Sequence, residues 1–101
     1  MNAYHALDAL GDPTRRAIFE QLVVRPHSVG ELAQRLPVSR PAVSQHLKLL
    51  KTAGLVADMP GAGNRRVYRV DPRGLEELRS YFERFWKHAL GAFKAAAERE
   101  D

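Results

Sequence analysis

The stretch from Ser39 to Gly54 constrains the fold most, because both of its ends carry signals that start or stop a helix. The Ser39 hydroxyl can accept a hydrogen bond from an amide that the first turn leaves unpaired. Pro41 stands in that first turn, where a missing N–H costs little. At the other end, Gly54 can adopt the left-handed conformation that ends many helices, and Lys51 complements the helix dipole. The stretch is therefore predicted to be one helix.

The two faces of this helix differ in chemistry. One face is apolar at three- and four-residue steps and predicts a buried stripe of Val43, Leu47 and Leu50, with Ala42 and Ala53. The opposite face has no carboxylate and carries Arg40, Ser44, Gln45, Lys48 and Lys51. Such a face suits the floor of a DNA major groove, although the same side chains could simply solvate an amphipathic helix.

A second short helix is predicted directly before this one. Ser28 and Glu31 have the spacing of a capping box, which predicts a helix from Val29 to about Arg35. Its inward-facing residues are expected to be Val29, Leu32 and Ala33. Only Leu36-Pro37-Val38 separates the two helices, and a short helix, a tight turn and a basic helix together predict a helix-turn-helix.

Two more helices are predicted at the start of the chain. Residues 3–10 have a helical pattern that Gly11 ends, and Asp12-Pro13 then gives an N-cap followed by proline at the first helical position. The second of these helices runs to about Val24, with Ile18, Phe19 and Leu22 as its core residues. Arg15 and Arg16 lie near its start, where the dipole disfavours them, and their role stays open. Residues 25–27 are expected to break the chain.

After Gly54 the hydrophobic period changes from helical to alternating. Residues 55–59 and 66–70 are predicted to be two strands of a hairpin, since the loop between them contains two glycines and an asparagine. Tyr68 and Val70 fall on one face of the second strand. A hairpin after a helix of this kind is the wing of a winged helix, and Arg65 and Arg66 are placed to reach phosphates or a minor groove. The alternative is a solvated turn with chance arginines.

A long final helix is predicted from Asp71-Pro72 to about Ala97, and it would be close to 40 Å long at ~1.5 Å per residue. Its apolar stripe is rich in aromatic residues, and a domain of this size cannot cover so long a face alone. We therefore predict a dimer whose interface combines this helix with the first one. The residues expected there are Leu7, Leu78, Phe82, Phe85, Trp86, Ala89 and Phe93. The alternative is that the stripe packs only on its own domain.

Composition narrows the classes of function. The chain has 101 residues and a net charge of +4, and residues 25–73 hold nine basic side chains against three acidic ones. A basic excess centred on the predicted helix-turn-helix and wing suits a surface that meets phosphates. The absence of cysteine excludes disulfides, thiolate metal sites and cysteine nucleophiles. Length and apolar pattern predict a single domain over residues 1–101 with no membrane span or leader, and hence a cytoplasmic location.

Five stretches carry a resemblance to a known family. They are residues 9–16 (ALGDPTRR), 28–33 (SVGELA), 38–50 (VSRPAVSQHLKLL), 53–56 (AGLV) and 65–68 (RRVY). In order and spacing they resemble the ArsR family of bacterial winged-helix repressors. The resemblance implies a homodimer whose recognition helices enter successive major grooves of a partly palindromic operator. By the same resemblance the DNA-facing positions are Ser39, Arg40, Pro41, Ser44, Gln45 and Lys48 on the recognition helix, with Arg65 and Arg66 on the wing.

The chain departs from the metal-sensing members of that family. Many of them hold metals or arsenite through cysteines in the third helix or His/Asp/Glu pairs in the last one, whereas here the third helix has no thiol and His88 stands alone. A site shared across the dimer by His5, Asp8 and His88 is conceivable. Partly exposed histidines at a subunit interface are the simpler interpretation. The resemblance is therefore to the metal-independent branch, and no metal or cofactor is expected.

Together these patterns predict a mainly α protein with a small β wing, in the order of four helices, two strands and a final helix. The predicted function is sequence-specific DNA binding and repression of transcription. The alternatives are a winged helix that docks another protein through its last helix, and a regulator with a ligand pocket near Tyr4, Tyr81, Phe85 and Trp86. An enzyme is not expected, because the sequence offers no glycine-rich phosphate loop, no paired carboxylates and only scattered histidines.

Overall fold

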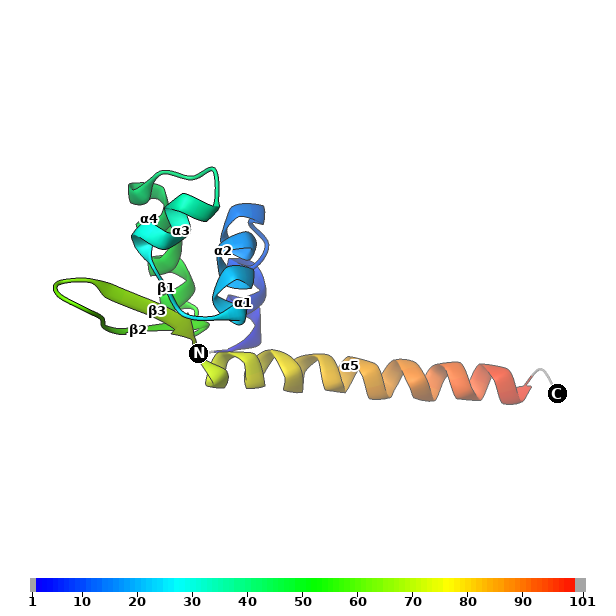
Figure 1. Cartoon of the computed structure of the whole chain (residues 1–101). Helices are drawn as coiled ribbons and strands as arrows, with labels where there is room; N and C mark the ends of the chain where they lie inside the picture. Colours follow the sequence, from blue (N-terminus) through cyan, green and yellow to red (C-terminus); the bar gives the residue numbers. More distant parts are fainter. Residues whose placement is uncertain (1, 100–101) are drawn as a thin grey trace.

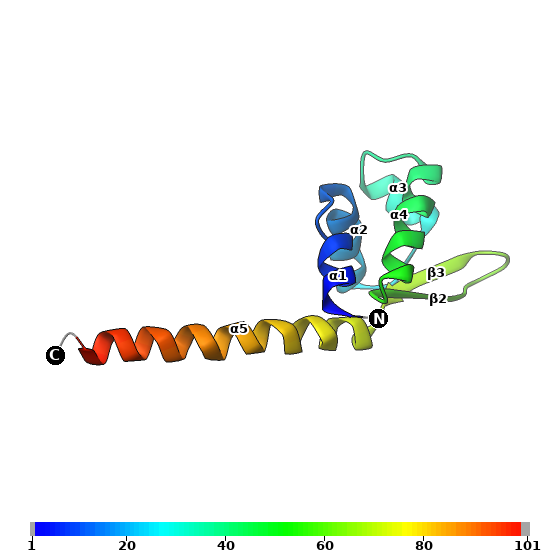
Figure 2. The ribbon, with the colours of Figure 1, turned by 180° about the vertical axis from the view of Figure 1, so that it is seen from behind.

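A small helical body sits on one end of a long helix in the computed structural model, which describes residues 2–99 (Figure 1). In chain order the elements are α1 (Ala3–Ala9), α2 (Pro13–Val24), β1 (His27–Ser28), α3 (Val29–Arg35), α4 (Arg40–Thr52), β2 (Val56–Pro60), β3 (Arg66–Val70) and α5 (Pro72–Arg99). The hairpin of β2 and β3 projects from the body, and the C-terminal part of α5 extends away from it in the other direction (Figures 1 and 2). The molecule therefore measures 66 × 25 × 20 Å along its principal axes.

The helix ends follow the local signals in the sequence. The side chains of Asp12, Ser28 and Ser39 accept hydrogen bonds from amides in the first turns of α2, α3 and α4, respectively. At Ser28 the capping box is complete, because the Glu31 carboxylate also accepts a hydrogen bond from the Ser28 amide. Gly54 has a φ of 80° just after α4. The predicted extent of the recognition helix is thus confirmed.

The role of Arg15 and Arg16, which the sequence left open, is to cap α1. Arg15 Nε donates to the carbonyl oxygen of Ala9 at 2.7 Å, and Arg16 Nη1 donates to that of Leu10 at 2.9 Å. These carbonyls belong to the last turn of α1, which has no intrahelical partners for them. The two arginines therefore fasten the end of α1 to the start of α2.

The sheet has three strands rather than the two that were predicted. Its order is β1-β3-β2, with both pairs antiparallel. The expectation that residues 25–27 only break the chain is wrong for His27, which pairs with Tyr68 while Ser28 pairs with Val67. A two-residue strand has no periodicity to reveal it, and its conformation depends on a partner about 40 residues away. The hairpin forms as predicted, but its first strand is shifted by one residue from the expected 55–59, so that Val56 pairs with Val70 and Pro60 with Arg66.

The core lies where the helices of the body meet the sheet. Its fully buried side chains include Ile18, Leu32, Val43, Leu47, Leu50 and Leu55. Tyr68 and Val70 pack against this cluster from one face of β3, as their alternation predicted. The core orients α4, because its buried stripe fixes which side of that helix faces outward.

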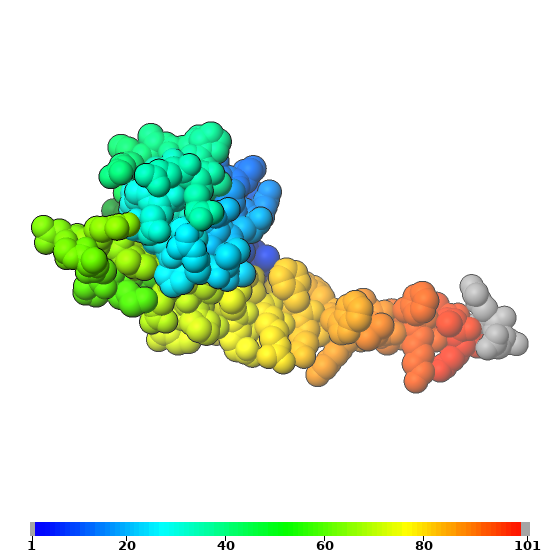
Figure 3. Space-filling view, in the orientation of Figure 1, coloured from blue at the N-terminus to red at the C-terminus, as the bar shows by residue number. Residues whose placement is uncertain are grey.

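The final helix contacts its own body only near its start. Gly74 and Leu78 are its buried residues, whereas every residue from 82 to 99 is exposed. In the space-filling view the second half of α5 projects as a bare rod (Figure 3). Within residues 2–99 no helix combines the length and apolar character that crossing a membrane requires.

Candidate nucleic-acid interface

The outward face of α4 carries the residues that the sequence assigned to DNA. Val43, Leu47 and Leu50 are completely buried, so the helix cannot rotate without exposing its core stripe. This places all six predicted recognition-helix residues in solvent, namely Ser39, Arg40, Pro41, Ser44, Gln45 and Lys48. They run from the N-cap of the helix to its third turn, and helix-turn-helix proteins contact base edges mainly with that N-terminal part of the recognition helix.

A groove continues from this face between α3, the start of α4 and the hairpin. Its walls include three arginines, namely Arg40, Arg65 and Arg66, beside Glu31 and Gln34. Arg40 lies across α3 at Gly30, since a Cβ built on that glycine would stand 3.1 Å from Arg40 Nη2. The absence of a side chain at Gly30 therefore leaves room for the first basic residue of the recognition helix.

Arg65, the last residue of the hairpin loop, is folded back onto the start of α3. Its Nη2 donates to Ser28 Oγ at 2.8 Å and lies 3.4 Å from Glu31 Oε1. The other carboxylate oxygen of Glu31 lies 3.6 Å from Arg25 Nη1. Hydrogen bonds from the Ser28 amide and hydroxyl, followed by the two arginines, hold the pKa of the Glu31 carboxyl below its usual value.

Arg66, the next residue, is bound by a different carboxylate. Its Nε lies 2.9 Å from Asp58 Oδ2, and Lys51 Nζ lies 2.7 Å from Asp58 Oδ1. Only 10% of the Asp58 side chain is exposed, compared with 57% for Arg66. The Lys51 hydrogen bond, aided by the charge of Arg66, lowers the pKa of the Asp58 carboxyl, which therefore stays ionised at neutral pH.

Sequence reasoning missed these two carboxylates. Glu31 was recognised only as a capping residue, and Asp58 as a residue of a strand. The pairs join Arg65 to a residue 34 positions earlier and Arg66 to one on the neighbouring strand. A hairpin register predicts that Asp58 and Arg66 lie near each other, so the strand alternation held a usable signal for that pair. Nothing local in the sequence connects Arg65 with Glu31.

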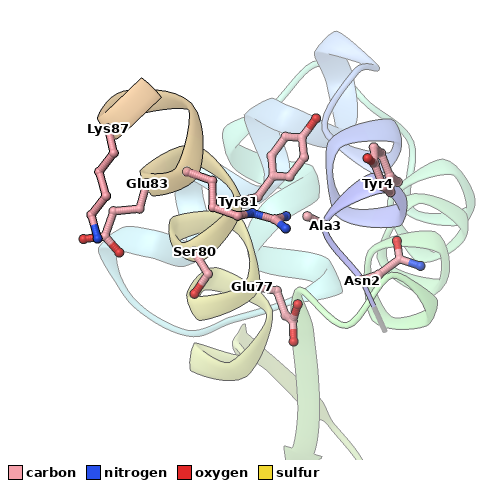
Figure 4. Close-up of a pocket in the computed structure, with 9 residues that line it drawn as sticks. Asn2, Ala3, Tyr4, Glu77, Ser80, Tyr81, Glu83 and Lys87 are labelled. Atoms are coloured by element: carbon pink, nitrogen blue, oxygen red, sulfur yellow. The ribbon is translucent and has the colours of Figure 1, made fainter. Parts of the chain in front are cut away.

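The second predicted surface, along α1 and α5, is aromatic. Tyr81 of α5 packs edge-on against Tyr4 of α1 with ring centroids 5.4 Å apart, and against Phe85 at 4.7 Å. Figure 4 shows Tyr4 and Tyr81 on facing sides of a hollow between the two helices. Beyond it, the residues predicted for the dimer interface are exposed at Phe82, Phe85, Trp86, Ala89 and Phe93.

Two residues predicted for that interface are used inside the subunit. Leu78 is only 8% exposed and belongs to the core cluster, and Leu7 packs against the same cluster. Leu78 therefore already contributes to the core of its own subunit, and its place in a dimer interface stays a prediction.

The histidines and carboxylates of the described residues do not gather into a metal site. Within residues 2–99 no three His, Asp or Glu side chains are close enough together to hold an ion. His5 and Asp8 line one hollow with Arg15, whose positive charge disfavours a cation there.

Comparison with known proteins identifies relatives over the whole chain. A family described as a helix-turn-helix domain matches residues 10–58, which contain α2, α3 and α4. The HTH-type transcriptional regulator Rv2034 of Mycobacterium tuberculosis is 56% identical over 99% of this chain and 96% of its own length. The HTH-type transcriptional repressor SmtB of the same organism is 45% identical over 71% of this chain and 53% of its own length. The solved structure of an ArsR-like transcriptional regulator from Rhodococcus sp. RHA1 has a TM-score of 0.74 and 36% identity, over 94% of this chain and 89% of that one.

Proposed function

Because the chain belongs to the ArsR family of helix-turn-helix transcriptional regulators, we propose that it works as a homodimer that binds a partly palindromic operator and represses transcription. It is a DNA-binding regulator and not an enzyme. In this proposal, transcription is repressed when the bound dimer covers a promoter. The protein then acts in the cytoplasm, where the DNA is. The relatives named as repressors support the direction of control.

The observation that carries this proposal is the outward face of α4. It presents exposed basic and hydrogen-bonding side chains with no acid among them, and it continues into a groove lined by three arginines. Phosphates attract such a surface whatever the base sequence, and the major groove is wide enough to admit the helix.

The eight proposed contact residues divide into two roles. Arg40 and Gln45 are assigned to base edges, since arginine can bind guanine through two hydrogen bonds and glutamine can bind adenine in the same way. The others are assigned to phosphates, where they set the register: Ser39, Ser44, Lys48, Arg65 and Arg66. Pro41 is assigned to contact with the DNA backbone. Base contacts confer preference, whereas phosphate contacts confer salt-dependent affinity.

The aromatic face of α5 supports the dimer. Phe82, Phe85, Trp86 and Phe93 are 52 to 74% exposed in the single subunit, and they follow one another along the same side of the helix. An apolar face of this size marks an interaction surface in soluble proteins. A second copy of α5 has a matching face and, as in most homodimers, can pair with it about a two-fold axis. Such a dimer would place two α4 helices about 34 Å apart, one turn of DNA.

No metal ion is part of the proposed signal. The sequence contains no cysteine, and the hollow with His5 and Asp8 also holds Arg15. We propose that DNA binding is regulated by another signal or by the concentration of the repressor alone. Operator binding is accordingly expected to be the same with and without added Zn²⁺ in the titration described next.

A gel-shift titration at increasing salt tests DNA binding through the basic face. If Lys48, Arg65 and Arg66 of both subunits neutralise six phosphates, the logarithm of the binding constant should fall against the logarithm of salt with a slope of about −5. An affinity that stays constant as salt rises would count against the basic face as the contact surface.

The assignment of Gln45 to a base edge and of Arg66 to a phosphate predicts two different mutant phenotypes. Gln45→Ala is expected to relax preference at one base pair per half-site, by about 1–3 kcal/mol, with little change at other positions. Arg66→Ala is expected to weaken binding to all operator variants alike and to reduce the salt slope. Binding to a library of operator variants measures both. Identical effects of the two changes would contradict the assignment.

A further inference from the structure

Both wing arginines are held by carboxylates of the same subunit. Arg65 ends the hairpin loop and Arg66 begins β3, and each is bound by a different acidic residue. Arg65 reaches Glu31 and Ser28 at the start of α3, and Arg66 reaches Asp58 on β2. Asp58 in turn binds Lys51 in the last turn of α4. The two ion-pair clusters therefore tie the hairpin to both helices of the helix-turn-helix.

Each pair occupies only part of its guanidinium. In the described structure Arg66 meets Asp58 through Nε, and Arg65 meets Ser28 and Glu31 through Nη2. A guanidinium has five N–H donors in a rigid fork, so one engaged edge leaves the other free for a phosphate. The Arg65 side chain is 59% exposed and that of Arg66 is 57% exposed, whereas only 10% of the Asp58 side chain is exposed.

Such an arrangement affects two kinds of DNA binding in opposite directions. Fixing a long side chain before binding saves the free-energy cost of ordering it during binding, but only for DNA that offers a phosphate at the fixed position. An operator with α4 in its major groove offers a phosphate at a constant position relative to the hairpin. Unrelated DNA binds in many positions and does not. The carboxylate also removes one positive charge, which weakens attraction to any DNA.

We propose that Asp58 and Glu31 are positioning residues that set the specificity of DNA binding. They hold Arg66 and Arg65 so that the free edge of each guanidinium meets an operator phosphate, and they lower the affinity for unrelated DNA. This inference rests on the proposed function, since it assumes that the wing contacts the operator.

The test compares operator DNA with unrelated DNA of equal length for the dimeric full chain. Asp58→Asn removes a negative charge at nearly unchanged shape, and it is expected to tighten binding to unrelated DNA while weakening operator binding. The ratio of the two affinities should fall about two- to tenfold per subunit, which corresponds to about 0.4–1.4 kcal/mol, the cost of ordering one long side chain. Glu31→Gln should act in the same direction while keeping the capping box, which accepts glutamine.

Two further variants separate positioning from charge and from folding. Glu76→Gln removes an equal charge from an exposed pair with Arg79 on α5, remote from the groove, and is expected to leave the ratio unchanged. Arg66→Lys conserves charge but lacks the fork, so it should weaken operator binding and leave unrelated DNA unaffected. A folding defect lowers both affinities together and cannot give these opposite shifts.

The inference and the proposed function can fail separately. If Asp58→Asn and Arg66→Lys leave the affinity ratio unchanged while Arg66→Ala weakens operator binding, the wing contacts DNA but the carboxylate does not position it. If Arg66→Ala has no effect on operator binding, the proposed wing contact itself is wrong. In the Arg66→Ala background, Asp58→Asn should no longer change operator binding beyond the shift it causes for unrelated DNA.

Discussion

Replacing Phe85 and Trp86 together by glutamate is expected to give a monomer that no longer distinguishes its operator from other DNA. These side chains are 56% and 64% exposed in the subunit, and burial of a large apolar side chain contributes about 1.5–3 kcal/mol. A symmetric interface loses that term four times and gains four carboxylates in an apolar contact. The loss exceeds what most dimers of this size could tolerate.

The consequence for DNA binding follows from the separation of the two recognition helices. A single subunit holds one α4 and one hairpin, so it contacts half of the operator and loses the advantage of linkage. Specific binding usually exceeds non-specific binding by at least about 10³-fold, and we expect a loss on that scale. Sedimentation equilibrium measures the mass, and a gel shift measures the binding.

A matched variant on the same helix controls for charge. Lys94→Glu places the same acid one residue beyond Phe93, about 100° around the helix from it. It should leave the dimer intact. A double variant that stays dimeric at micromolar concentration would show that the aromatic face of α5 is not the interface.

Gly74→Ala is expected to cause the largest loss of stability of any single methyl addition in the described chain. A Cβ at residue 74 would overlap the carbonyl oxygen of Gly54 and lie 3.1 Å from the Cα of Leu55. Both are backbone atoms, and Gly54 has a φ of 80° that fixes the exit from α4. The first turn of α5 therefore has to move away from α4, which costs about 2–3 kcal/mol.

Thermal unfolding followed by circular dichroism at one protein concentration measures this effect. A loss of 2–3 kcal/mol lowers the Tm by about 8–20 °C in a domain of this size. Gly91→Ala is the control, because nothing lies within 4 Å of a Cβ there. It removes a helix-interior glycine and should raise stability by roughly 0.5–1 kcal/mol. Equal Tm values for the two variants would contradict the close contact between α5 and Gly54.

The sequence predicted most of the elements because their ends are encoded locally. Asp12, Ser28 and Ser39 cap helices within three residues of themselves, and β3 was predicted over its full extent. The buried stripe of α4 then determined its outward face. These features need no knowledge of distant parts of the chain.

What the sequence did not predict depends on contacts between distant residues. His27 becomes part of a strand only because β3 lies beside it. Arg15 caps α1 through the fold of the turn between two helices, and Leu78 faces inward because the body covers the first turns of α5. For the same reason the partners of Arg65 could not be predicted, and the wing was expected to carry free cations where the structure has ion pairs.

The exposed second half of α5, residues 82–99, is expected to link the lifetime of the protein to its concentration. Most helical stability in proteins comes from packing of the apolar face, and residues 82–99 leave their side chains largely exposed in the single subunit. In the proposed dimer this segment is buried, whereas an unpaired subunit exposes it to proteases. Dilution on cell growth would then speed the turnover of the repressor, so its level falls more sharply than dilution alone would cause.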